Sequence, residues 1–133
     1  MHADFRPDNF LFGRADDAPA LAVVDWQTLT SGSSVSDVAY LLGAAIDPAR
    51  RRDGERAHLD TYRSHLAGYG VDYAADVCWD DYALGSFHGI IVGITATIMA
   101  TETERGNNLF ALMLNRHAQH VIDVDGIDRL AAL

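Results

Sequence analysis

The chain has 133 residues, 49% of them hydrophobic, and a formal net charge of −9. Its length predicts one domain with a core of its own, and its net charge argues against binding to a nucleic-acid backbone, which draws on clustered basic residues. No uninterrupted apolar run approaches the roughly 18 residues that span a bilayer, so we expect a protein without a membrane segment.

The stretch from His2 to Asn9 holds polar side chains at a spacing that suits phosphoryl transfer. His2, Asp4 and Asn9 form the pattern His-x-Asp-x-x-x-x-Asn, and a later apolar segment ends in Asp25 and Trp26. Phosphoryl transfer needs a carboxylate that accepts or orients the proton of the attacking hydroxyl. It also needs hard oxygen ligands, such as an amide and a second carboxylate, that hold Mg²⁺ against the phosphates. Asp4, Asn9 and Asp25 are residues of these types.

Short apolar runs at 10–13 and 20–24 flank a polar segment at 14–19, and this pattern predicts a β-hairpin. Residues 26–36 are rich in Thr, Ser and Gly and predict a loop. Ser36 is expected to cap a helix that has Asp37 in its first turn and runs to about Ile46. The chain therefore begins with a hairpin and then turns helical.

Three further helices are predicted, at 48–67, 79–100 and 105–121, followed by a terminal helical turn or two at 127–133. The second is dense in apolar residues and should be the buried central helix, with Cys78, which cannot form an internal disulfide, buried just before it. The Arg triplet at 50–52 is expected on a solvated helix face. His117 and His120 are expected to be exposed near a helix end, more simply than to bind zinc with Asp123 and Asp125.

The motif, the apolar strand ending in Asp25-Trp26, Gly32 and the segment 36–42 together resemble the aminoglycoside phosphotransferase and choline- and ecdysteroid-kinase-like group. The resemblance covers the catalytic half. It implies the protein-kinase-like fold, with 1–133 as one α+β, predominantly α-helical domain: the catalytic and acceptor-binding C-terminal lobe with an N-terminal β-hairpin. The Gly that follows the His in that family is Ala3 here, a mild change unless the backbone takes a positive φ.

The resemblance also implies roles for individual residues. Asp4 is the catalytic base, His2 belongs to the catalytic loop and braces it, Asn9 and Asp25 bind Mg²⁺, and Asp37 supports the site from the next helix. The implied donor is ATP or GTP, and the implied acceptor is a hydroxyl of a small molecule. Acidic side chains that would meet a cationic acceptor are available at Asp80, Asp81, Glu102 and Glu104.

All ten basic residues other than histidine are Arg, so the Lys with which kinase-like enzymes pair the nucleotide phosphates is missing. The sequence opens inside the catalytic loop, and we expect a truncated kinase whose nucleotide lobe is absent and which is inactive alone. No basic-then-apolar leader is present, which favours a cytoplasmic location. An exposed hairpin would favour self-association through Phe10, Leu11, Leu21 and Val23.

Three alternatives remain open on the sequence. The first is that the chain is a non-catalytic kinase-like lobe that binds a partner. The second is that it is a hydrolase that uses Asp4 and His2, although no Ser or Cys stands in an activating motif. The third alternative is that the polar residues before the hairpin form an ordinary turn.

Overall fold

The computed structural model describes residues 1–14, 19–99 and 103–133. Two antiparallel strands, β1 (Phe10–Phe12) and β2 (Leu21–Val23), are flanked by short 3-10 turns, η1 (Pro7–Asn9) and η2 (Trp26–Thr28). The helices are α1 (Val35–Ala45), α2 (Pro48–Gly68), α3 (Ala75–Gly85), α4 (Phe87–Met99), α5 (Glu104–Asp123) and α6 (Gly126–Ala131). The fold is mostly helical with one small sheet, in agreement with the α+β class that the sequence predicted.

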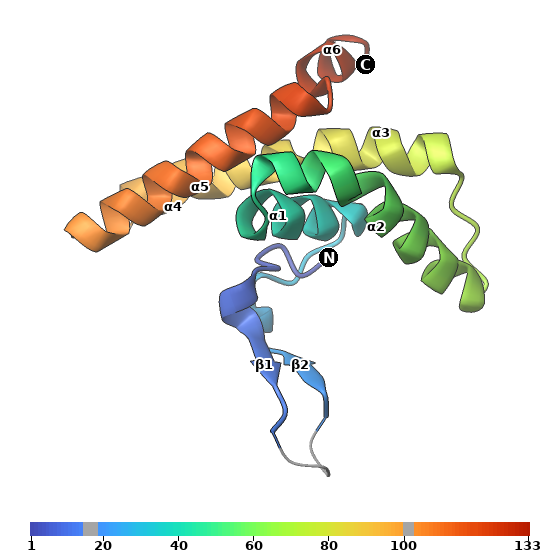
Figure 1. The fold of residues 1–133 in the computed structure, drawn as a ribbon, viewed down its shortest axis with the longest axis horizontal. Coiled ribbons are helices and arrows are strands. Elements are labelled where there is room, and N and C mark those ends of the chain that lie inside the picture. Colours follow the sequence, from blue (N-terminus) through green and yellow to red (C-terminus); the bar gives the residue numbers. More distant parts are fainter. Residues whose placement is uncertain (15–18, 100–102) are drawn as a thin grey trace.

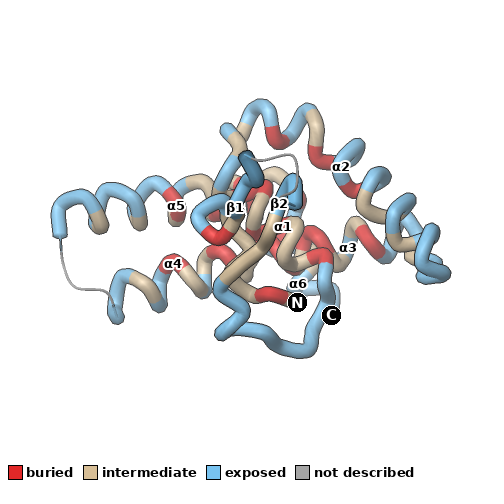
Figure 2. The backbone as a smooth tube through the Cα atoms, turned by 90° about the horizontal axis from the view of Figure 1, so that it is seen from below, coloured by how far each residue is buried: buried red, intermediate tan, exposed pale blue. Residues whose placement is uncertain are grey.

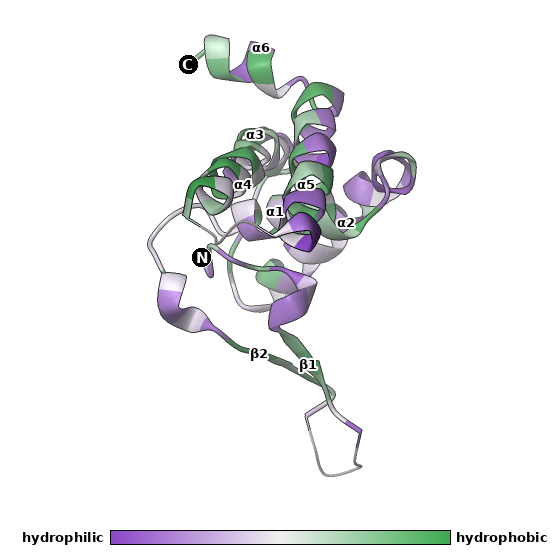
Figure 3. Cartoon of the chain, turned by 90° about the vertical axis from the view of Figure 1, so that its left-hand side faces the viewer, coloured by the Kyte–Doolittle hydropathy of each residue, from purple (hydrophilic) through white to green (hydrophobic). Residues whose placement is uncertain are grey.

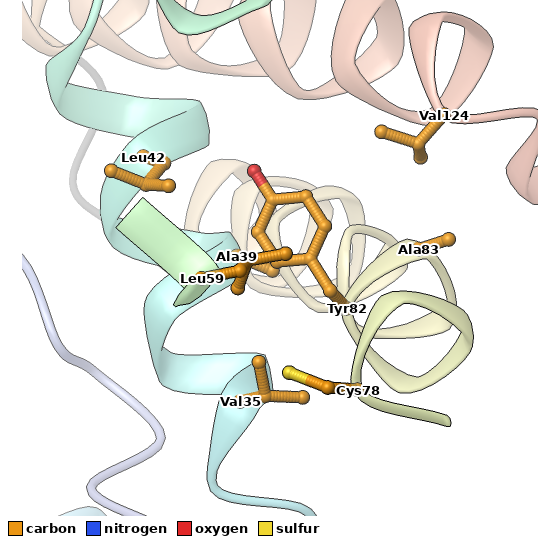
Figure 4. Packing of buried hydrophobic residues seen from close by; sticks show 8 residues of the cluster. All are labelled: Val35, Ala39, Leu42, Leu59, Cys78, Tyr82, Ala83 and Val124. Carbon is orange, nitrogen blue, oxygen red and sulfur yellow. The ribbon is translucent and has the colours of Figure 1, made fainter. Parts of the chain in front are cut away.

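Helix α1 is the element against which the other long helices pack, because α2, α3, α4 and α5 all contact it (Figure 1). Val35, Ala39 and Leu42 lie at helical spacing and supply its buried face. They join Tyr82 and Cys78 of α3 in the hydrophobic core, where the Cys78 thiol faces Val35 (Figure 4). Burial raises the pKa of that thiol, and Cys78 is buried as predicted.

The hairpin pairs Phe10 with Val23 and Phe12 with Leu21, which confirms the predicted strands. Its turn at 15–18 lies outside the described residues. The strands project away from the helices, so both faces meet solvent (Figure 1), and Leu11 and Phe12 are 56% and 71% exposed. The hairpin gains little from burial, and its function in the fold is to connect the loop at Asn9 to the residue Asp25.

The predicted central helix at 79–100 is two helices. Helix α3 begins at Ala75, four residues earlier than expected, and buried Ser86 separates it from α4. The expectation that this helix is buried throughout is wrong for α4, of which only Gly89 and Gly93 are buried while Ile91 and Ile98 are 62% and 78% exposed. The helix packs through small residues against α5, so its large side chains face outward.

Helices α3 and α4 together form a stretch, Ala75–Met99, that is long and apolar enough to cross a membrane by length and composition alone. A core helix of a soluble protein can be as long and as apolar, and 33% of the 18-residue apolar window within this stretch is buried in the protein. The stretch contains three charged residues, Asp76, Asp80 and Asp81, so it is not one of the uninterrupted apolar runs that the sequence analysis considered.

Three polar residues that were expected at the surface are buried. Arg51 is 1% exposed, and both His117 and His120 are fully buried, so the predictions of a solvated Arg face and of exposed histidines are wrong at these positions. Arg51, Glu55 and Leu59 lie at i, i+4 and i+8 on the buried face of α2. Buried positions gather where the helices cross, while the far ends of α4 and α5 stay exposed (Figure 2).

Helix starts follow local capping, with one correction. Asp47 caps α2 by accepting the Ala49 N–H at 3.0 Å, and Pro48 takes the first helical position as predicted. Helix α1 begins at Val35, so Ser36 is inside it and is not its cap. The Ser36 N–H is already engaged by the Ser33 carbonyl, at 3.1 Å, in the turn that leads into the helix.

Candidate active site

The loop at the N-terminus is fastened to helix α1 by one carboxylate. The backbone N–H groups of His2 and Ala3 donate to the two oxygens of Asp37, at 2.5 and 2.8 Å. Asp37 lies in the first turn of α1, where the helix dipole favours a negative charge. Hydrogen bonds to an ionised acceptor are stronger than neutral ones, so this carboxylate fixes where the loop starts relative to the helix.

His2 joins the same loop to the end of the hairpin. Its Nδ1 accepts the Asp4 N–H at 3.2 Å, which places the ring proton on Nε2, and Nε2 donates to the Val24 carbonyl at 2.9 Å. The ring is 2% exposed. Since the backbone engages both ring nitrogens, His2 has no nitrogen left for proton transfer. This argues against the hydrolase alternative.

Ala3 adopts a left-handed backbone conformation, with φ of +66°. The sequence analysis expected the replacement of the family's Gly by Ala3 to be mild unless the backbone takes a positive φ. Because φ is positive, the replacement destabilises this conformation. An L-residue other than Gly pays about 1–2 kcal/mol in this conformation. The hydrogen bond that the Ala3 N–H donates to Asp37 holds Ala3 there against that cost.

The Asp4 carboxylate is oriented by three neighbours. The Asn9 amide nitrogen donates to the Asp4 backbone carbonyl at 2.8 Å and to its Oδ2 at 3.1 Å. The Arg6 guanidinium lies 3.3 Å from Oδ1, and the Tyr40 hydroxyl donates to the same oxygen at 3.4 Å. The side chain is still partly open to solvent. A carboxylate held in place at the edge of an open region can accept a proton from a bound molecule.

Behind Asp4, aromatic side chains from three helices form a rigid backing. Tyr40 of α1 stacks on His117 of α5 at 5.3 Å and meets the edge of His88 of α4. His88 Nε2 lies 2.7 Å from the Ala3 carbonyl. Burial, with the nearby Asp4 charge, raises the pKa of Tyr40 to about 12, so its hydroxyl stays protonated as a donor. The sequence reading assigned no role at the site to these three residues.

Asn9 and Asp25 present the oxygen donors that Mg²⁺ prefers. The Asn9 amide nitrogen is taken by Asp4, which leaves its side-chain oxygen for another partner. Asp25 is exposed, and in the described ranges no hydrogen bond or ion pair engages its carboxylate. The Val24 N–H donates to the Asn9 carbonyl at 3.0 Å, so both residues lie at the same end of the hairpin. One amide and one carboxylate oxygen fit Mg²⁺ that is bound together with phosphates and water.

In the described part of the chain, no cluster of three or more His, Cys, Asp or Glu side chains could hold a metal ion. The alternative of a zinc site at His117 and His120 therefore finds no support. Asp123 is occupied by Arg52 at 2.9 Å and by Arg51.

A cleft of about 740 Å³ opens beside Asp4, within the range of small-molecule sites. The loop and η2 form its polar wall through Asp4, Arg6 and Thr28. Helices α4 and α5 form the opposite wall, and much of α4 is apolar along its length (Figure 3). The apolar residues of this wall are Ile91, Val92, Ala96, Met99, Leu109 and Phe110. Asp4 is thus the carboxylate that a molecule in the cleft would meet.

The acidic residues considered for a cationic acceptor do not line this cleft. Asp80 forms an ion pair with Arg129, and Asp81 accepts from the Tyr73 hydroxyl, so both carboxylates are engaged within the protein. Glu104 lies in the first turn of α5 and is also not part of the cleft wall. Glu102 lies outside the described residues.

A family model described as the phosphotransferase enzyme family matches residues 1–75. The chain belongs to this family. The matched part contains the loop, the hairpin, α1 and α2, and therefore every residue from His2 to Asp37 that the resemblance singled out. No curated protein and no solved structure gives a significant match.

Proposed function

We propose that this member of the phosphotransferase family carries the catalytic and acceptor-binding part of a small-molecule kinase, which transfers the γ-phosphoryl group of ATP or GTP to a hydroxyl. The observation that supports this most directly is the Asp4 carboxylate, held by the Asn9 amide at 3.1 Å and open to a cleft of about 740 Å³. Family membership supports the reaction class, and the cleft supports a small-molecule acceptor.

In the proposed reaction Asp4 accepts or orients the proton of the acceptor hydroxyl as its oxygen attacks the γ-phosphorus in line. The bond from that phosphorus to the bridging oxygen breaks, and the nucleoside diphosphate leaves with the electron pair. Asn9 and Tyr40 keep the carboxylate in position through their hydrogen bonds. Asn9 and Asp25 would hold Mg²⁺, which when bound neutralises charge on the phosphate oxygens.

Kinase-like enzymes pair the nucleotide phosphates with a Lys, and this chain contains none, because all ten of its Lys and Arg positions are Arg. In the proposed reaction the contacts to the nucleotide therefore come largely from residues other than these. Alignment of two reactants accounts for roughly 7–11 kcal/mol of barrier reduction in favourable cases. We therefore expect the 133 residues alone to give no measurable turnover, and a chain joined to a nucleotide-binding lobe to recover it.

The test uses such a joined protein and the variant Asp4→Asn. Loss of the base should lower kcat by at least about 10²-fold with little change in KM, because a base acts on the chemical step. Asp8→Asn is the matched control, since Asp8 is an exposed acid in the same loop. Near-normal kcat in Asp4→Asn, or an equal loss in Asp8→Asn, would show that Asp4 is a turn residue without a catalytic role.

A second candidate, a non-catalytic lobe that binds a partner chain or a second copy, is favoured by the projecting hairpin. Phe12 and Leu21 are 71% and 47% exposed on strands that project away from the helices (Figure 1). Absence of phosphoryl transfer in the joined protein, together with association that Phe12→Ser abolishes, would favour this candidate.

A further inference from the structure

We propose that the acceptor hydroxyl is carried by an uncharged molecule with an apolar body, which lies in the cleft between the Asp4 loop and helices α4 and α5. This inference rests on the proposed function and adds the chemical class of the acceptor. It differs from the expectation that acidic side chains such as Asp80 and Asp81 would meet a cationic acceptor.

The apolar wall is the first observation behind the proposal. Ile91 is 62% exposed, Met99 80% and Leu109 47%, and all three line the same cleft. Large apolar side chains that gather on one surface beside a functional group mark a binding site more often than a chance pattern. Covering such side chains with an apolar ligand gains roughly 25 cal/mol per Å² of surface removed from water.

The charges of the cleft are the second observation. Among the residues that line it, only Asp4 and Arg6 are charged, and they lie 3.3 Å apart. A cationic acceptor would find the one carboxylate already paired and a guanidinium next to it. Burying an ammonium group without a free partner is costly. The electrostatics therefore select against a positive charge on the acceptor.

The threonines of the cleft reduce its polarity further. The Thr28 hydroxyl donates to the His2 carbonyl at 2.8 Å, and the Thr95 hydroxyl donates to the Ile91 carbonyl at 2.8 Å. Both protons are used within the protein, so neither hydroxyl offers a donor to a ligand. The polar groups left to orient an acceptor are Gln27 and the Asp4–Arg6 pair, which lie on the loop side of the cleft. One hydroxyl directed to that side and an apolar body on the other match this distribution.

The test measures binding to the 133-residue chain, which avoids any need for turnover. The protein carries labelled Ile and Met methyl groups and is titrated by NMR with trans-4-tert-butylcyclohexanol and with the corresponding amine, which is protonated at neutral pH. The alcohol should shift the Ile91 and Met99 methyl signals in a saturable manner. The ammonium analogue should bind at least about tenfold more weakly.

Two variants on helix α4 provide a matched comparison. Ile91→Asp places a charge in the apolar wall and should weaken binding of the alcohol at least about tenfold. Ile94→Asp changes a residue that is 49% exposed on the same helix and does not line the cleft, so binding should stay within about twofold. Both positions are at the surface, so both variants should fold.

The proposal is overturned if the amine binds as tightly as the alcohol, or if alcohol binding is absent or insensitive to Ile91→Asp. It is also overturned if the cleft methyl signals shift with protein concentration alone, because a second copy would then be the occupant. Phosphorylation of a cationic acceptor by the joined protein would refute this inference and leave the proposed function standing. Selective alcohol binding without phosphoryl transfer to any alcohol by the joined protein would refute the proposed function alone.

Discussion

The loop at Asp4 and the polar core between helices α2, α3 and α5 are built from the same kinds of side chains but differ in exposure. In the loop, a carboxylate and an amide hold each other and remain beside an open cleft. In the core, Arg51 is 1% exposed and Glu55 is 5% exposed, and their charges are satisfied within the protein. Side chains of the same kinds therefore border an open cleft in one region and join packed helices in the other.

The polar core is a network that joins three helices. Arg51 donates to Glu55 at 2.9 Å and also pairs with Asp123 of α5, while the Tyr82 hydroxyl of α3 donates to Glu55 at 3.1 Å. His120 packs against the Tyr82 ring at 5.1 Å. Since water is excluded from most of these groups, each depends on its partners more than a surface group does.

The largest expected effect that separates the two regions is the pH dependence of stability. Burial lowers the pKa of His117 to about 4 and that of His120 to about 3, from an ordinary value of 6.5. The unfolded chain takes up these protons below pH 6.5, whereas the folded chain resists until much lower pH. Stability should be flat above that value and fall between pH 6.5 and about 3, by on the order of 8 kcal/mol for the pair.

Other groups that face the two histidines modify the size of this loss. Burial raises the pKa of Glu55, so the fold gains some stability as pH falls through that region, whereas the lowered pKa of Asp123 adds a loss below about pH 3.8. The facing groups are Tyr40 from α1, Arg51 and Glu55 from α2, Tyr82 from α3, His88 from α4 and Asp123 from α5. Urea unfolding at a series of pH values gives the free energy of unfolding as a function of pH. His120→Gln should reduce the slope of that function between pH 6.5 and about 3. If the slope is unchanged in that variant, His120 does not cause the loss of stability at low pH.

The next effect comes from removing one member of the buried ion pair. Arg51→Ala leaves Glu55 and Asp123 without their shared partner and should lower the free energy of unfolding by about 3–5 kcal/mol. Arg50→Ala removes an exposed Arg one position earlier and should change it by less than about 0.5 kcal/mol. Equal losses in the two variants, measured by urea unfolding, would mean that the network does not stabilise the fold.

The smallest effect tests strain in the loop. Ala3→Gly relieves a φ of +66° and should raise the free energy of unfolding by about 1 kcal/mol. Ala57→Gly, at an exposed position inside α2, should lower it by about the same amount. Thermal unfolding of the two variants should therefore shift in opposite directions. A destabilised Ala3→Gly variant would show that the loop holds no such strain.

The sequence motif was sufficient to predict which loop residues lie together, because their interactions are nearly local. Asp4 and Asn9 are five residues apart and bond to each other, and His2 reaches Val24 through the paired strands of one hairpin. The hairpin and most helices also followed from alternation, helical spacing and capping, with ends displaced by a few residues, but the single helix predicted at 79–100 is the pair α3 and α4. Family membership now stands on the match over residues 1–75, while the catalytic and metal roles of Asp4, Asn9 and Asp25 remain predictions.

The sequence by itself thus determined the α+β class, the order of the elements and the phosphotransferase family, since short-range spacing and motif chemistry carry that information. Only the tertiary structure decided which polar residues are buried, because Arg51 meets Asp123 and Tyr40 meets His117 across more than seventy positions of chain. Gly89 and Gly43 allow His117 to approach, since a Cβ at either would lie within 2.1 and 2.6 Å of its Nδ1. The apolar cleft has the same origin: helix α4 packs through its small residues, and Ile91 and Met99 are thereby left facing Asp4.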